Sequence, residues 1–195
     1  MRKTCCIVIL CFFYAAAAAQ SVAVINGKPV ELKEFMWVYQ KHRPGSGKTT
    51  LTQLISFLNI YVDFKLKVLD ACNLQLDKDS TYLAEVKNYE AAFVASLPAD
   101  LQQRDHSLVI NEYKEALLLF NISERKIWDI MADSESDIHN YYTSNVTVYD
   151  SKPYDEVKSD VAADFQQQLE CNWVTALRNK YKVTIDQTAL QRLIR

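Results

Sequence analysis

The amino-acid sequence predicts a mainly α-helical fold, completed by a small β-sheet that joins an N-terminal hairpin to a C-terminal strand. Only three glycines and four prolines interrupt the 195 residues, which favours long helices. Asn26-Gly27, flanked by Val22 to Ile25 and by Val30, is the strongest short-range signal for a type I′ hairpin turn. A second β pattern, Tyr181 to Asp186, lies near the C-terminus. Because two strands alone form a marginal sheet, we expect the two ends of the chain to meet in one sheet.

The first 19 residues are typical of a cleavable secretion signal. Arg2 and Lys3 precede an apolar run, and Ala17-Ala18-Ala19 offers an A-x-A cleavage site before Gln20. The run is shorter than the roughly 20 apolar residues that span a bilayer, so we expect a periplasmic protein with no membrane insertion after cleavage. Cleavage removes the two positive charges of Arg2 and Lys3, so the net charge falls from −2 to −4. This charge argues against a nucleic-acid partner.

The mature chain, residues 20–195, has a length that suits a single domain. We expect a β-hairpin over residues 20–31, helices over residues 32–144, a short linker over residues 145–153, and a last helix and strand over residues 154–195.

The expected helices have recognisable ends. Thr50 and Gln53 form a T-x-x-Q capping box for a helix that reaches about Leu76 and is apolar on nearly every side, as expected of a helix covered by neighbours. Asp79 or Ser80 caps the next helix. Pro98 stops that helix, and the following helix extends from Ser107 to about Met131. A capping box at Ser134 to Asp137 begins a short helix that reaches about Ser144. The last helix has Pro153 in its first turn.

Apolar residues occupy every fourth position of the last helix: Val157, Val161, Phe165, Leu169, Trp173, Leu177 and Tyr181. At about 100° per residue, each step of four overshoots a full turn by about 40°. The apolar stripe therefore winds around the helix. We expect this helix to pack obliquely, or to pass from one partner to another along its length.

The stretch Arg43 to Leu54, RPGSGKTTLTQL, looks at first like a phosphate-binding loop. A P-loop requires G-x-x-x-x-G-K-[ST] after a buried strand, but His42 stands where the first glycine belongs, and the preceding residues have a helical spacing. A flexible break between two helices, followed by the capping box, explains these residues. We therefore expect no nucleotide partner.

Cys72 and Cys171 are the cysteines that remain after signal cleavage. In an oxidising compartment they could form a disulfide that closes about 100 residues and stabilises the fold by up to about 4.7 kcal/mol. Alternatively, each is a small buried apolar residue. We favour the second interpretation, because both lie within helical patterns and nothing in the sequence fixes their separation.

Three stretches resemble a known family: VAVINGKPVELKEF, FKLKVLDACNLQLDKDSTYLAEVKNYEAAF and EYKEALLLFNISERKIWDIM. They look like the N-terminal chaperone region of SurA-like, parvulin-type peptidyl-prolyl isomerases in their Bacteroidetes form. YDEVKSDVAADFQQQLECNWVTALRNKYKVTID resembles the C-terminal helix and strand of the same proteins. The resemblance implies a multi-helix SurA-like chaperone domain and covers most of the mature chain.

The sequence departs from this family where the relatives carry one or two parvulin domains. Only SNVTVYDSKPYDE occupies that interval, which is too short for a domain with its own sheet, catalytic histidines and glycine-rich stretch. His42, His106 and His139 are isolated from one another in the sequence. No catalytic triad, C-x-x-C or H-E-x-x-H pattern is present, so we expect no enzyme activity, no catalytic residues, no metal and no cofactor.

The leading hypothesis is an ATP-independent periplasmic chaperone that holds unfolded or outer-membrane-bound polypeptides against apolar, aromatic-rich helical surfaces. The residues chosen for client contact are Met36, Tyr39, Tyr89 and Phe93, although core packing accounts for most aromatic rings in any fold. One alternative is a non-catalytic assembly subunit that binds a paralogous, full-length isomerase. A further alternative is an isomerase by family descent only.

Overall fold

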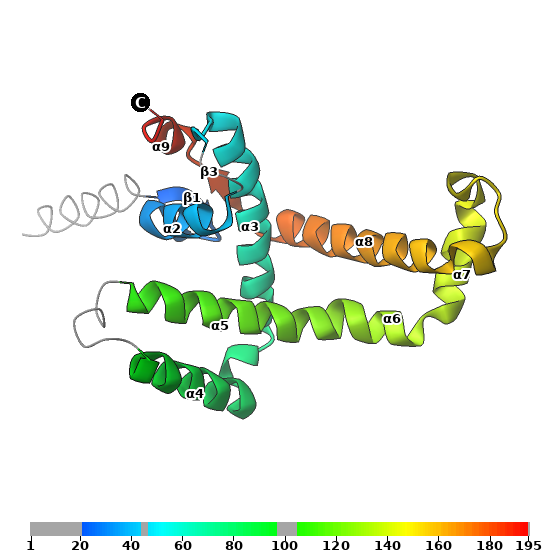
Figure 1. The fold of residues 1–195 in the computed structure, drawn as a ribbon, viewed down its shortest axis with the longest axis horizontal. Coiled ribbons are helices and arrows are strands. Elements are labelled where there is room, and N and C mark those ends of the chain that lie inside the picture. Colours follow the sequence, from blue (N-terminus) through cyan, green and yellow to red (C-terminus); the bar gives the residue numbers. More distant parts are fainter. Residues whose placement is uncertain (1–20, 44–46, 97–104, 195) are drawn as a thin grey trace, which may run out of the picture. The chain divides into compact units, whose positions relative to one another are not determined.

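The computed structural model describes residues 21–43, 47–96 and 105–194 (Figure 1). The predicted secretion signal, the cleavage site and Pro98 lie outside the described residues. The predicted fold class is confirmed: the chain is mainly helical, and its one small sheet in this part combines N-terminal and C-terminal strands.

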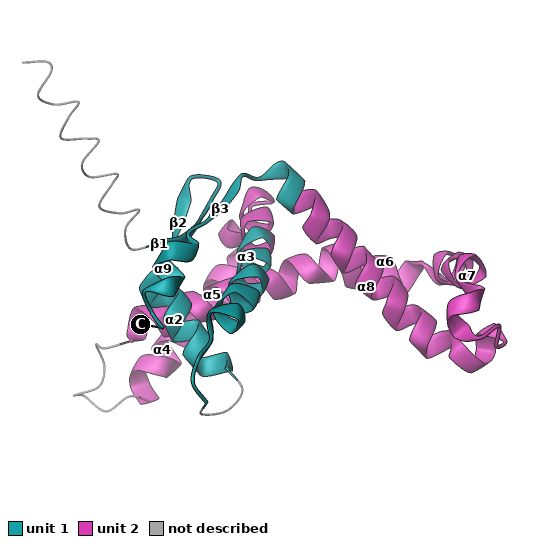
Figure 2. Ribbon diagram, turned by 90° about the horizontal axis from the view of Figure 1, so that it is seen from above, with its two compact units in different colours: residues 1–66, 178–195 teal, residues 67–177 magenta. Residues whose placement is uncertain are grey.

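The described chain forms two compact units, coloured separately in Figure 2. Unit 1 contains residues 21–66 and 178–194, and unit 2 contains residues 67–177. Helix α3 (Leu51–Asn73) and helix α8 (Tyr154–Lys180) each contribute residues to both units. The expectation of a single domain over residues 20–195 therefore stays a prediction.

The sheet of unit 1 has the strand order β2-β1-β3 and is antiparallel throughout. Strands β1 (Ser21–Ile25) and β2 (Lys28–Glu31) form the predicted hairpin, and Asn26 and Gly27 have φ angles of 49° and 81°, as a type I′ turn requires. Strand β3 (Val183–Ile185) pairs with the other edge of β1, where Ala23 faces Ile185. The two ends of the chain meet as predicted.

A short C-terminal helix that the sequence did not predict, α9 (Gln187–Gln191), follows β3. The Asp186 carboxylate caps it by accepting hydrogen bonds from the backbone N–H groups of Thr188 (2.9 Å) and Ala189 (3.1 Å). Leu190 of this helix is completely buried. The segment is too short for hydrophobic periodicity to identify it, and the Asp-x-Thr start was the available signal.

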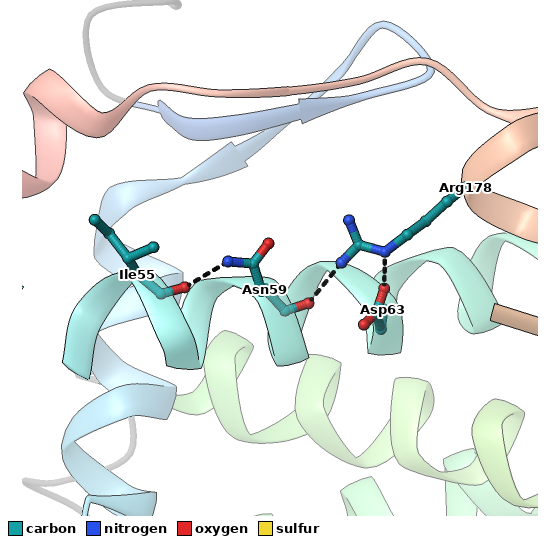
Figure 3. Close-up of polar contacts among 4 residues, drawn as sticks. All are labelled: Ile55, Asn59, Asp63 and Arg178. Atoms are coloured by element: carbon teal, nitrogen blue, oxygen red, sulfur yellow. Dashed lines mark hydrogen bonds and ion pairs between the residues drawn. The ribbon is translucent and has the colours of Figure 1, made fainter. Parts of the chain in front are cut away.

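Helix α2 (Leu32–His42) packs in unit 1 against the first part of α3. Glu34 of α2 accepts a hydrogen bond from the Tyr61 hydroxyl at 2.6 Å and forms an ion pair with Lys65. The end of α8 is fixed to the same helix, because Arg178 donates to the Asp63 carboxylate (2.6 Å) and to the Asn59 carbonyl (3.2 Å), as Figure 3 shows.

Unit 2 contains most of the helices. After a 3-10 turn at Leu76–Lys78, its elements are α4 (Ser80–Ser96), α5 (His106–Ser123), a π-helical segment η2 (Glu124–Trp128), α6 (Asp129–Asp133), α7 (Glu135–Ser144), a 3-10 turn η3 (Val146–Tyr149), and α8 up to Leu177. Asp79 caps α4 as predicted, since its carboxylate accepts from the Thr81 N–H at 2.8 Å. Ser134 occupies the predicted cap position of α7, but its side chain makes no capping hydrogen bond.

Within residues 145–153, the expected linker, Tyr149 packs into a cluster of unit 2. Tyr149 of η3 is buried with Ile138 of α7 and with Val157 and Val161 of α8. Its hydroxyl donates to the Asp164 carboxylate at 2.8 Å. Burial and this hydrogen bond raise the pKa of Tyr149 above its ordinary value.

The winding apolar stripe of α8 changes partners, as predicted. Val157 and Val161 belong to the cluster around Tyr149, whereas Trp173 lies beside the end of α3, where its indole N–H donates to the Asp70 carboxylate at 3.1 Å. Phe165 and Leu169 between these two contacts are only partly buried. No helix among the described residues is both long enough and apolar enough to span a bilayer.

Candidate functional site

The P-loop-like stretch begins helix α3, as predicted. The Thr50 N–H donates to the Gln53 side-chain oxygen at 2.9 Å, and the Gln53 N–H donates to the Thr50 hydroxyl at 3.3 Å. These two bonds are the reciprocal pair of a capping box. Helix α2, rather than a buried strand, precedes the stretch. The first-turn N–H groups of Thr50 and Gln53 are therefore engaged within the chain.

A half-open pocket of about 310 Å³ lies in unit 1 beside this helix start. Its apolar floor is formed by Tyr39, Phe57 and Ile60. The other lining residues are His42, Arg43, Gly47, Lys48, Thr49, Thr52, Gln53 and Ser56. We call this the Arg43–Lys48 pocket, after these two basic side chains of its lining. It combines basic and hydroxyl-bearing side chains with an aromatic floor.

Met36 and Tyr39, two residues chosen for client contact, lie on α2 in unit 1. Tyr39 is only 5% exposed, because its ring contacts Phe35 and Phe57, with centroids 6.2 Å and 5.2 Å apart. It nevertheless forms part of the floor of the Arg43–Lys48 pocket. Met36 is half-buried and does not line the pocket. The structure thus places Tyr39, but not Met36, in the lining of this pocket.

Tyr89 and Phe93 lie together on α4 in unit 2, where they belong to an aromatic stack. The Tyr89 ring is parallel to the ring of Tyr113 on α5, with centroids 3.6 Å apart, and Phe93 contacts His106 at 5.7 Å. Both residues are half-buried. The stack joins α4 to α5, so much of each ring is occupied by packing between these helices.

The most exposed aromatic pair on α5–α6 was missed by the sequence analysis. Phe120 and Trp128 are 53% and 40% exposed, and their rings contact edge to face with centroids 5.0 Å apart. Phe120 precedes the π-helical segment η2, and Trp128 is its last residue; at the end of this segment the Asp129 N–H donates to the Glu124 carbonyl five residues earlier. The π-helical segment adds one residue to the helix without adding a turn.

This extra residue explains why the two rings meet. In a regular α-helix, Phe120 and Trp128 would point about 80° apart, whereas one residue absorbed by a π-turn reduces the difference to about 20°. The same shift brings Ile127 to within about 40° of Ile122 instead of about 140°. Both isoleucines are completely buried. In the sequence, the π-turn is therefore indicated by the spacing of these two core residues, which is five positions instead of the three or four of a regular α-helix.

Deletion of Arg125, an exposed residue of η2, is expected to leave the protein folded. The deletion converts the π-turn to regular α-helix while Ile127 and Trp128 keep their faces, so we expect the melting temperature to change by only a few degrees. Deletion of the equally exposed Ala116, in the regular part of α5, rotates all later residues by about 100° and should unfold this helix pair. Circular dichroism melting of both variants tests this prediction. Equal destabilisation would contradict the role assigned to the π-turn.

Two further polar features of unit 2 are structural. A pocket of about 200 Å³ beside η2 is lined by Asp79, Tyr82, Glu85, Glu124 and Arg125, among others, but Asp79 caps α4 and Glu85 accepts a hydrogen bond from Tyr113 at 2.9 Å. Burial raises the pKa of Tyr82 to about 12, and its hydroxyl donates to the Lys114 carbonyl at 3.4 Å.

The remaining residues considered from the sequence are dispersed. Cys72 is half-buried and Cys171 is exposed, and no disulfide joins them, so the favoured interpretation of a buried apolar residue is wrong for Cys171. His106 and His139 each contact an aromatic ring. In the part of the chain that the structure describes, no group of three or more His, Cys, Asp and Glu residues is arranged to hold a metal ion.

Comparison with known proteins found no matching family model, no matching curated protein and no matching solved structure.

Proposed function

We propose that this chain is an ATP-independent, chaperone-type protein of the periplasm, which holds unfolded or outer-membrane-bound polypeptides on exposed apolar helical surfaces. The observation that carries the proposal is the exposed Phe120–Trp128 pair. Isolated surface hydrophobic residues are normal in soluble proteins and need no explanation. Here, however, two large rings are brought into contact on one face by an irregular turn, and both remain accessible.

Other exposed apolar residues lie on helices α4 and α6 of the same unit. Leu83 and Val94 on α4 are 52% and 40% exposed, and Ile130 on α6 is 40% exposed. Several separate exposed apolar side chains suit a client with no fixed structure, because an unfolded chain can contact them in different combinations. Binding the unfolded state in this way removes it from aggregation without any energy source.

The SurA-like resemblance supports the same proposal from the sequence. Chaperone-type binding is the part of that family's function that needs only helical surfaces, whereas isomerisation needs a parvulin domain for which residues 145–153 leave no room. A proline-isomerisation assay on a short peptide tests whether the chain lacks isomerase activity, and clear turnover would contradict the proposal.

Suppression of client aggregation should depend on the aromatic pair. We expect the wild-type chain to slow light scattering when a urea-unfolded outer-membrane β-barrel protein is diluted into buffer. Phe120→Ser combined with Trp128→Ser should weaken client binding about tenfold, because most of the apolar area of two rings is lost. The concentration needed for half-maximal suppression should rise accordingly.

The matched control is Val148→Ser combined with Leu74→Ser. These residues are 68% and 47% exposed in the same unit but lie away from the pair in sequence. This variant should suppress aggregation like the wild type, and circular dichroism should show that both variants are folded. No suppression by the wild-type chain would favour the assembly-subunit alternative. Equal loss in both variants would show that the pair has no special role.

A further inference from the structure

The Arg43–Lys48 pocket has a composition that differs from the rest of the chain. Among the residues that the structure describes, its lining includes three basic residues, His42, Arg43 and Lys48, and no Asp or Glu. Over the whole sequence, acidic residues outnumber basic ones, 24 to 22. A pocket lined only by cationic and neutral groups in an acidic protein favours an anionic ligand group.

The apolar floor of the pocket indicates that the ligand also carries an apolar group next to its anionic group. Phe57 packs edge to face on Tyr39, and Ile60 is 67% exposed at the surface. An apolar side chain placed on this floor would bury Ile60 and part of the Phe57 ring, which is favourable in proportion to the area covered. Thr49, Thr52 and Ser56 also line the pocket, and their hydroxyl groups add hydrogen-bonding partners for a ligand.

The geometry does not favour phosphate or nucleotide. Phosphate sites at helix starts use backbone N–H groups that point at the ligand. At the start of α3, the N–H groups of Thr50 and Gln53 are already bonded within the capping box, and the Leu54 N–H donates to the Thr50 carbonyl at 3.1 Å. The chain itself thus occupies part of the backbone donors at this helix start, so we assign the anion to the basic side chains. Arg43, whose guanidinium lies 3.4 Å from the Thr49 hydroxyl, can hold a carboxylate with two parallel hydrogen bonds.

The size and openness of the pocket favour a peptide. Small-molecule sites enclose most of their ligand, in cavities of about 300–1,000 Å³. The Arg43–Lys48 pocket is at the lower end of this range and is half open to solvent. An extended peptide can place one apolar side chain and an adjacent carboxylate here and continue into solvent on both sides.

We propose that the Arg43–Lys48 pocket of unit 1 is a peptide-binding subsite that accepts an acidic residue next to a large apolar residue. Arg43 and Lys48 bind the carboxylate, and Tyr39, Phe57 and Ile60 bind the apolar side chain. The subsite is built only from residues of unit 1, so it does not rest on the Phe120–Trp128 pair in unit 2.

Fluorescence anisotropy with the full chain tests the subsite. The probe is a Gly/Ser peptide that carries a central Glu-Phe-Asp sequence and a fluorophore of zero net charge. The expected result is saturable binding that weakens with added salt. Peptides with Gln-Phe-Asn or Glu-Ser-Asp at the centre should each bind about tenfold more weakly, because the first lacks the carboxylates and the second lacks the ring.

Two variants with the same change in net charge distinguish a specific site from general attraction. Arg43→Gln combined with Lys48→Gln should weaken binding of the Glu-Phe-Asp peptide about tenfold. Lys28→Gln combined with Lys33→Gln removes two exposed charges of unit 1 outside the pocket and should change affinity by less than about twofold, because surface charges are screened. Phe120→Ser with Trp128→Ser should leave binding unchanged.

Three outcomes would overturn the subsite. Equal weakening by both charge variants would show attraction by overall charge. Equal binding of the Gln-Phe-Asn peptide would remove the role of the carboxylate. Displacement of the peptide by inorganic phosphate, but not by an unlabelled copy of the peptide, would identify a simple anion site.

Discussion

Replacement of Phe35 by alanine is expected to lower the free energy of unfolding of unit 1 by about 3–5 kcal/mol. Phe35 is completely buried, and its ring lies 6.2 Å from Tyr39, 5.9 Å from Phe57 and 6.0 Å from Tyr61, measured between centroids. Removing it leaves a cavity between α2 and α3 that its three aromatic neighbours cannot fill completely. Urea denaturation followed by circular dichroism measures the loss.

Gln40→Ala on the same helix is the control, because Gln40 is exposed and surface changes usually alter stability by less than about 0.5 kcal/mol. If the two compact units unfold in separate transitions, the loss should fall on the transition reported by Trp37 fluorescence, since Trp37 belongs to unit 1. A loss below about 1 kcal/mol for Phe35→Ala would show that the aromatic cluster is not a packed core.

The same substitution links stability to binding. Tyr39 and Phe57 both contact Phe35 and both form the floor of the Arg43–Lys48 pocket. A cavity behind the floor should let these rings move, so the Phe35→Ala variant should bind the Glu-Phe-Asp peptide more weakly even in the absence of urea. Anisotropy at a temperature where the variant is still folded measures this effect.

The local features of the fold were predictable from the sequence because their signals are local. Asn26-Gly27 can adopt the positive φ angles of the hairpin turn at little cost, and Thr50 with Gln53 satisfies N–H groups that are three residues apart. The stripe of α8 also follows from a repeat within one helix. Each of these predictions needs only the geometry of a single element.

Features that join distant segments were not predictable in the same way. The stack of Tyr89 on Tyr113 depends on how α4 and α5 align, and periodicity gives the apolar face of a helix but not its partner. The π-helical segment was missed because α5 is apolar on several sides, so one added residue does not disturb the average pattern. Its only trace was the five-residue step from Ile122 to Ile127.

The candidate site was predicted only in part, for a related reason. An aromatic residue on a helix can pack in the core or face solvent, and composition does not separate these cases. Tyr39 was predicted from its position beside the Gly/Pro break and proves to be buried, and the other predicted contact residues are half-buried. Phe120 and Trp128 are more exposed than any of them. Exposure is a property of the packed helices and not of a single segment.

Replacement of Trp173 by alanine is expected to lower the stability of unit 2 by about 3–5 kcal/mol. Trp173 is 9% exposed, its indole N–H donates to the buried Asp70 carboxylate at 3.1 Å, and the Lys67 ammonium lies 4.9 Å from the ring centroid. The substitution therefore removes ring packing, a hydrogen bond and a cation–π contact together. It also leaves Asp70, which is 7% exposed, without its indole donor.

Two further variants separate these contributions. Trp173→Phe keeps an aromatic ring but removes the N–H group, so we expect a loss of about 1.5–3 kcal/mol, the usual contribution of a hydrogen bond to a charged group. If that reasoning is correct, Asp70→Leu should cost less in the Trp173→Phe background than in the wild type, because the carboxylate it removes has already lost the indole donor. Denaturation of the two single variants and the double variant gives the coupling energy of the pair. Additive losses would mean that Trp173 stabilises α8 against α3 through ring packing alone, and that the polar contact between residues 103 positions apart contributes nothing.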